Sequence, residues 1–192
     1  MPGLSPGSGK PSLASGLIPY HGSTVEASDA VTFPAGFLIS LLIVLAGAFL
    51  LDRRGRGRLG LIWIGLFLAG NAIEVLCKTV IDRPALYARD HGRLVEVLHF
   101  QNSFPSGHSL RSIVIAAVLA SLLRGRWAAL VWLWAGAVLV DLLVDGIHAP
   151  TDILAGALLA GVLMLGVPLL EAAWSRLPLW RIALRPSREA AR

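Results

Sequence analysis

Two short segments of this chain hold residue types that could act chemically on a bound anion. Phe104, Pro105, Ser106, Gly107 and His108 lie where a long polar connector gives way to an apolar stretch. Proline suits the first turn of a helix, where its missing N–H costs nothing. That turn leaves backbone N–H groups unpaired, so we expect Ser106 and Gly107 to offer theirs to an anion beside His108.

The second segment contains His148 and Asp152, four residues apart at the start of another apolar stretch. One helical turn separates these positions, so the carboxylate should reach the imidazole. A carboxylate that accepts from one ring nitrogen fixes the tautomer and leaves the other nitrogen as a nucleophile or base. His108 could then protonate a leaving oxygen. Together the two segments predict nucleophilic and acid–base catalysis on one anion.

Membrane spans must position these residues, because the composition exceeds what a soluble fold usually carries. The chain is 55% hydrophobic, with a mean hydropathy of +0.69. A spanning helix needs about 20 mainly apolar residues. Five stretches qualify, at residues 33–51, 59–77, 106–123, 127–147 and 150–170. Short connectors make consecutive spans antiparallel neighbours, which predicts an all-α, polytopic membrane helical bundle of about five transmembrane helices.

The bundle is expected to occupy residues 31–172. Residues 1–30 are rich in Gly, Ser and Pro, which predicts a flexible or interfacial leader. Residues 173–192 are expected to form a basic cytoplasmic tail. Cys77 is the single cysteine, so disulfides and cysteine metal sites are excluded.

The net positive charge of the chain indicates its membrane topology rather than nucleic-acid binding, because the arginines cluster beside the ends of the predicted spans. The clusters follow the first, third and fifth predicted spans, within residues 53–58, 124–126 and 176–192. If the spans alternate, all three clusters lie on one side, and the positive-inside rule makes that side cytoplasmic. We therefore expect a protein of the cell (plasma) membrane whose N-terminus and polar span ends lie outside.

Ionisable residues within the predicted spans collect at that outer end. Such residues are costly inside a membrane and usually mark function. They are Glu74, Lys78, His108, Arg111, Asp141, Asp145, His148 and Asp152. The charged connector at residues 79–105 is long enough to be functional as well. The i,i+4 spacing of Glu74 and Lys78 predicts an ion pair within one helix.

These residues resemble the type 2 phosphatidic acid phosphatase superfamily over roughly residues 78–156. Three sequence blocks mark that family: a lysine followed by Arg-Pro, a Pro-Ser-Gly-His, and a Ser-Arg followed by a histidine and then an aspartate. Residues 105–108 match the middle block completely. The order of the blocks, their placement across the spans and their predicted outer location also agree with the family.

The resemblance implies a role for each candidate residue. His148 would be the nucleophile that forms a phosphohistidine, Asp152 its orienting partner, and His108 the general acid for the leaving alcohol. The phosphate would be bound without a metal or cofactor, by Lys78, Arg83, Ser106 and Gly107.

The chain departs from the family at two arginine positions. The Arg and Pro of the first block would fall on Ala85 and Leu86, whereas an Arg-Pro stands two residues earlier at Arg83. The Ser-Arg of the third block is replaced by Asp141 and Leu142.

We consider three explanations for these departures. Arg111, one turn after His108, could point into the site and supply the missing charge, balanced by Asp141 or Asp145. Alternatively, the substrate carries its own cation or binds a changed pocket, as in related phosphotransferases. In the third explanation the site is a degraded relic.

The sequence therefore predicts an integral-membrane phosphatase with a lipid phosphate as substrate and membrane lipids as its surroundings. Polyprenyl diphosphate, phosphatidic acid and phosphatidylglycerophosphate all remain open as substrates. The alternatives are a lipid phosphotransferase of the same fold, a small transporter, and a lipid-binding protein. The confinement of polar residues to one end argues against transport, and the pairing of His148 with Asp152 argues against simple lipid binding.

Overall fold

The computed structural model describes residues 30–83, 102–144 and 148–176, and its regular elements within these ranges are all helical. A 3₁₀ turn, η2 (Phe33–Ala35), precedes α2 (Phe37–Arg53), α3 (Gly57–Val80), α4 (Gly107–Leu122), α5 (Arg126–Val144) and α6 (Pro150–Arg176). Each predicted span corresponds to one helix, so the all-α bundle is confirmed. The predicted leader and most of the predicted basic tail lie outside the described residues.

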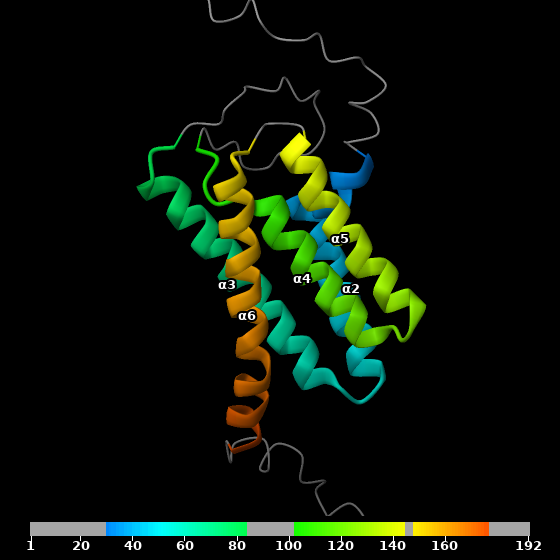
Figure 1. Ribbon diagram of the computed structural model, residues 1–192. Coiled ribbons are helices and arrows are strands. Elements are labelled where there is room, and N and C mark those ends of the chain that lie inside the picture. The colour runs from blue at the N-terminus through cyan, green and yellow to red at the C-terminus, as the bar shows by residue number, and fades with distance from the viewer. Residues whose placement is uncertain (1–29, 84–101, 145–147, 177–192) are drawn as a thin grey trace, which may run out of the picture.

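The helices run alternately up and down the bundle (Figure 1). The starts of α2, α4 and α6 lie at one end, with the ends of α3 and α5. At the opposite end, Arg54 Nη1 donates to the Leu122 carbonyl at 2.6 Å and Arg56 Nη1 to the Ser121 carbonyl at 3.0 Å. These bonds satisfy carbonyls that the last turn of α4 leaves unpaired, and the cations complement the helix dipole.

Helix α4 lies at the centre of the bundle and packs against η2, α2, α3, α5 and α6. Within the described part of the chain, α3, α5 and α6 are long and apolar enough to cross a membrane. Helices α2 and α4 are shorter, with 17 and 16 residues. Most side chains of α4 are buried against other helices. Because its neighbours shield it from lipid, α4 does not have to match the thickness of the bilayer.

Small residues hold α6 against α4. A Cβ on Gly156 would overlap the backbone oxygen of Ser106 and lie 3.1 Å from the Cβ of Ser109. Ser109 Oγ donates to the carbonyl of Ile153 at 2.8 Å, and Ala160 is fully buried two turns farther along α6. Small residues that let backbones approach are a common basis of helix association in membranes. This contact fixes the distance between the two helix starts that carry the predicted catalytic segments.

Replacement of Gly156 by Ala should therefore destabilise the bundle, because the added methyl group overlaps main-chain atoms that cannot rotate away. We expect a loss of about 1–3 kcal/mol, measured as a lower melting temperature in detergent. Gly161→Ala is the matched control, because nothing lies within 4 Å of a Cβ there, and alanine favours a helix over glycine by ~1 kcal/mol. A Gly156→Ala protein as stable as Gly161→Ala would contradict the close α4–α6 contact.

Candidate active site

Asp152 is fully buried at the polar end of the bundle and is surrounded by polar partners. Its Oδ2 accepts hydrogen bonds from Ser103 Oγ at 2.9 Å and from the Ala149 N–H at 3.1 Å. Its Oδ1 lies 3.1 Å from Arg83 Nη1. As the third residue of α6, Asp152 can reach back to the residue that caps the helix, and it faces the positive end of the helix dipole. Groups from two chain segments thus compensate a buried negative charge.

His148 lies just before α6, with Nδ1 facing the Asp152 carboxylate. The distance from Nδ1 to Asp152 Oδ2 is 3.9 Å, so the i,i+4 spacing brings ring and carboxylate together but not within hydrogen-bond length. Burial lowers the pKa of His148 from its ordinary 6.5, and the charge of Lys78 lowers this pKa further. Asp152, Glu74 and the Ser103 backbone act in the opposite direction. The ring is therefore neutral near pH 7, as a nucleophile must be.

Ser106 is the N-cap of α4. Its Oγ accepts from the Ser109 N–H at 3.5 Å, while its own N–H donates to the backbone carbonyl of Asp152 at 3.0 Å. The expectation that the Ser106 N–H is unpaired is therefore wrong, because this bond ties the start of α4 to the start of α6. Gly107 and His108 follow as the first two residues of α4.

Glu74 of α3 connects two cations beneath the start of α4. Its Oε1 accepts from Lys78 Nζ and its Oε2 from Arg111 Nη1, each at 2.8 Å. The intrahelical pair of Glu74 and Lys78 predicted from the sequence is confirmed. A Cβ on Gly107 would overlap the Glu74 carboxylate. The Glu74 carboxylate therefore packs directly against the first residue of α4, in the space where any other residue would have its Cβ atom.

Arg111 is buried and extends from α4 towards α3 and η2. Its Nε donates to the carbonyl of Ala35 at 2.7 Å, and its Nη1 also donates to Asn71 Oδ1 at 3.0 Å. The sequence suggested Asp141 or Asp145 as the carboxylate that balances this charge. In the structure Arg111 forms an ion pair with Glu74. Asp145 lies outside the described residues, so its pairing with Arg111 stays a prediction. The role of Arg111 in phosphate binding stays a prediction.

Arg83 contacts Asp152 from the start of the connector, at a distance of 3.1 Å from Nη1 to Oδ1. Its guanidinium is 5.8 Å from the centre of the Phe104 ring, in addition to the ion pair with Asp152. Its side chain remains 39% exposed, so one face of this cation is accessible from outside the bundle. Arg83 thus reaches the predicted site even though it stands two residues before the expected position.

Two connector residues that the sequence analysis did not single out complete the site. Ser103 donates to Asp152 through its hydroxyl and to the Arg83 carbonyl at 2.8 Å through its N–H. Asn102 accepts from the Arg83 N–H at 3.2 Å and donates to the Lys78 carbonyl at 2.8 Å. The only sign of their role in the sequence is that both polar residues directly precede Phe104 and the Pro-Ser-Gly-His block. They fasten the end of the connector to the end of α3.

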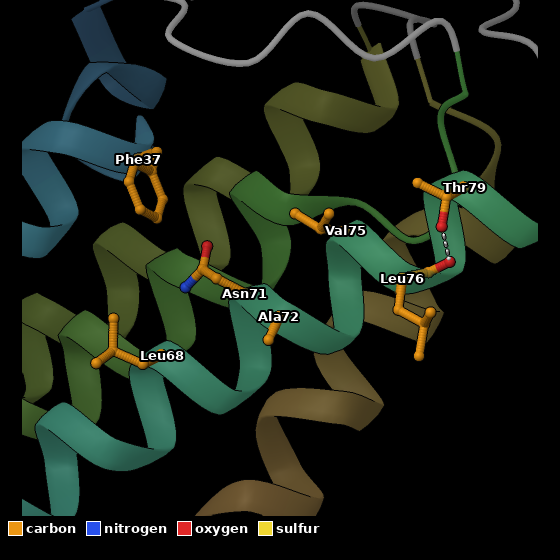
Figure 2. Close-up of a pocket in the computed structure, with 7 residues that line it drawn as sticks. All are labelled: Phe37, Leu68, Asn71, Ala72, Val75, Leu76 and Thr79. Carbon is orange, nitrogen blue, oxygen red and sulfur yellow. Dashed lines mark hydrogen bonds between the residues drawn. The ribbon is translucent and has the colours of Figure 1, made fainter.

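An apolar groove runs beside this polar end, where α2 meets α3 (Figure 2). It encloses about 440 Å³ and is lined by Phe37, Leu68, Asn71, Ala72, Val75, Leu76 and Thr79. Leu68 and Leu76 are 49% and 61% exposed, so the groove opens to the outside of the bundle. Asn71 joins it to the charged cluster through the bond with Arg111.

Comparison with known proteins gives one match. A family model described as the PAP2 superfamily matches residues 59–176, more than half of the chain and all eight candidate residues. No curated protein and no solved structure matches the chain significantly.

Protonation of His148 should destabilise the folded protein. Because its pKa is lowered by burial, the unfolded chain binds this proton more readily. The resulting stability is fully present above pH 6.5 and is lost as the pH falls below that value. We expect the melting temperature of the wild type to fall more steeply than that of His148→Gln between about pH 7.5 and about pH 5. Parallel pH profiles would show that His148 is not held neutral.

Proposed function

Since the chain belongs to the PAP2 superfamily, whose members are generally phosphatases, we propose that it hydrolyses a phosphate monoester or diphosphate carried on a membrane lipid. The observation that carries the proposal is the arrangement around Asp152. This carboxylate faces the His148 ring, while the Asp152 backbone is bonded to the start of α4, where His108 stands.

In the proposed reaction His148 attacks phosphorus and forms a phosphohistidine. Because Nδ1 faces Asp152, Nε2 is the attacking nitrogen. The bond between phosphorus and the lipid oxygen breaks, and His108 donates a proton to that leaving oxygen. Water then attacks phosphorus and gives a proton to His108 while the bond between phosphorus and nitrogen breaks, which releases phosphate and restores both histidines. Asp152 stabilises the positive charge that develops on the ring and orients it in both steps.

Cations and the start of α4 would stabilise the charge on phosphate. Lys78 and Arg83 supply positive charge, and the N–H groups of Gly107 and His108 belong to the turn whose donors suit an anion. Positioning and charge stabilisation are the main requirements of phosphoryl transfer. Ser106 would contribute by capping α4 rather than by binding phosphate through its N–H. The proposed mechanism assigns no step to a metal or cofactor.

The groove between α2 and α3 supports a lipid as the carrier of the phosphate. Its lining is almost wholly apolar, and it extends along α3 to Thr79, the neighbour of Lys78. A hydrocarbon chain buried there gains roughly 0.8 kcal/mol per methylene group. We further propose that the site faces the outer side of the plasma membrane, because the arginines at the other end satisfy the positive-inside rule.

Transfer to a second lipid alcohol, instead of to water, would use the same histidines. One observation supports this alternative. Leu142 stands where the family has an arginine, and its side chain is buried with Val138 and Ile153. A pocket without that arginine has a changed complement of positive charge. The ratio of released phosphate to phosphorylated alcohol, measured with labelled substrate, separates hydrolysis from transfer.

The central test is phosphate release from a panel of lipid phosphates by the detergent-purified protein. We expect turnover by the wild type and a loss of at least about 10³-fold in His148→Ala and His108→Ala, because each removes a partner in the chemical step. Glu171→Gln, an exposed change near the other end of α6, is the control and should keep wild-type turnover. Equal activity in wild type and both histidine variants would exclude the proposed mechanism.

Filling the groove should weaken binding of the lipid chain without altering the chemical step. We expect Ala72→Phe to raise KM by about tenfold for a long-chain lipid phosphate and to leave kcat unchanged. A short-chain substrate should be unaffected. Leu61→Phe, on the same helix but near its other end, is the control. An equal rise in KM for both chain lengths would remove the groove from substrate binding.

A further inference from the structure

We propose that Glu74 is a positioning residue that holds Lys78 beside the start of α4, in the place where this cation contacts phosphate. The inference rests on the proposed function for the role of Lys78. It gives Glu74 a part in phosphate recognition even though a carboxylate repels a phosphate.

The first observation is the difference in exposure among the three charged side chains. The side chains of Glu74 and Arg111 are 6% and 9% exposed, whereas that of Lys78 is 13% exposed. Lys78 is therefore the most exposed of the three side chains. A lysine ammonium has three donors, so Lys78 can contact phosphate while Glu74 holds it.

The second observation is that the inner end of this chain of contacts is fixed. Arg111 bonds to the Ala35 carbonyl and to Asn71, and Asn71 Nδ2 in turn donates to the Phe67 carbonyl at 2.7 Å. Glu74 is thus anchored through Arg111 to backbone groups of η2 and α3. A lysine side chain has many rotamers of its own. The hydrogen bond from Lys78 to the anchored Glu74 carboxylate restricts the Lys78 side chain to the rotamers that point towards Glu74.

The third observation is the contact with Gly107. The Glu74 carboxylate packs against the first residue of α4, where a Cβ would overlap it. One side chain therefore touches both the cation and the helix start that the proposed mechanism assigns to phosphate. A displacement of Glu74 would move the two phosphate-binding elements relative to each other.

A purely structural role is the competing explanation, because a buried ion pair that loses one partner is costly wherever it lies. The two roles differ in one respect. If Glu74 acts through Lys78, its replacement should no longer weaken phosphate binding once Lys78 is removed. If it only stabilises the bundle, its replacement should have the same effect in either background.

The test is a double-mutant cycle in the full-length protein, using Glu74→Gln, Lys78→Met and the double variant. Two quantities are measured, namely the affinity for inorganic phosphate by calorimetry and kcat/KM for the lipid phosphate. We expect Glu74→Gln to lower each at least about tenfold, the size of a weakened charge-assisted hydrogen bond. In the Lys78→Met background the same change should lower neither quantity by more than about twofold. Glu171→Gln, which removes an exposed carboxylate, should change neither.

Equal fold losses in the two backgrounds, or no loss in Glu74→Gln, would overturn the positioning role. Should Glu74→Gln fail to fold, Glu74→Asp takes its place, since it keeps the charge and shortens the reach to Lys78. For Glu74→Asp too, a loss only in the presence of Lys78 would support the positioning role, and equal losses in both backgrounds would overturn it. The phosphate-binding cycle also separates the two proposals. Coupled binding without lipid phosphate hydrolysis would refute the proposed function alone, and hydrolysis with uncoupled effects would refute the role of Glu74 alone.

Discussion

The buried carboxylate of Asp152 is the constraint on which the polar end of the bundle depends. A charge removed from water is costly unless hydrogen bonds and opposite charges surround it. Ser103, Arg83 and the Ala149 N–H supply these partners from the connector and from the turn before α6. The Asp152 backbone carbonyl also holds the Ser106 N–H. The need to satisfy one aspartate thus brings together Arg83, residues 103–106 and the start of α6, which are distant in sequence.

The second group of charges, around Glu74, follows the same principle. Arg111 would be a costly residue inside the bundle without Glu74, and it also donates to the Ala35 carbonyl and to Asn71. These contacts account for an arginine at a position that the family pattern does not require. They also distinguish two kinds of positive charge: Arg111 is buried against protein groups, whereas Arg83 keeps an exposed face.

The sequence was sufficient for features that depend on local spacing. Apolar runs of about 20 residues predicted the helices, and the i,i+4 rule predicted the pair of Glu74 with Lys78 and the approach of His148 to Asp152. The sequence was insufficient for hydrogen bonds and ion pairs between residues on different helices. The bond from the Ser106 N–H to Asp152 depends on how closely α6 approaches α4, and the pairing of Arg111 with Glu74 depends on the rotation of α4 relative to α3. Neither quantity is encoded in the spacing of residues along one helix.

The shortness of α4 has a consequence for the depth of the site. Its 16 residues span about 24 Å at a rise of ~1.5 Å per residue, whereas the hydrocarbon core is about 30 Å thick. Arg54 and Arg56 hold its last turn, and arginines at a span end favour the membrane surface. With that last turn at one membrane surface, we expect the first turn of α4 several ångströms below the opposite surface. The proposed lipid substrate could deliver its phosphate to that depth, where a lower local dielectric would strengthen the proposed attraction to Lys78 and Arg83.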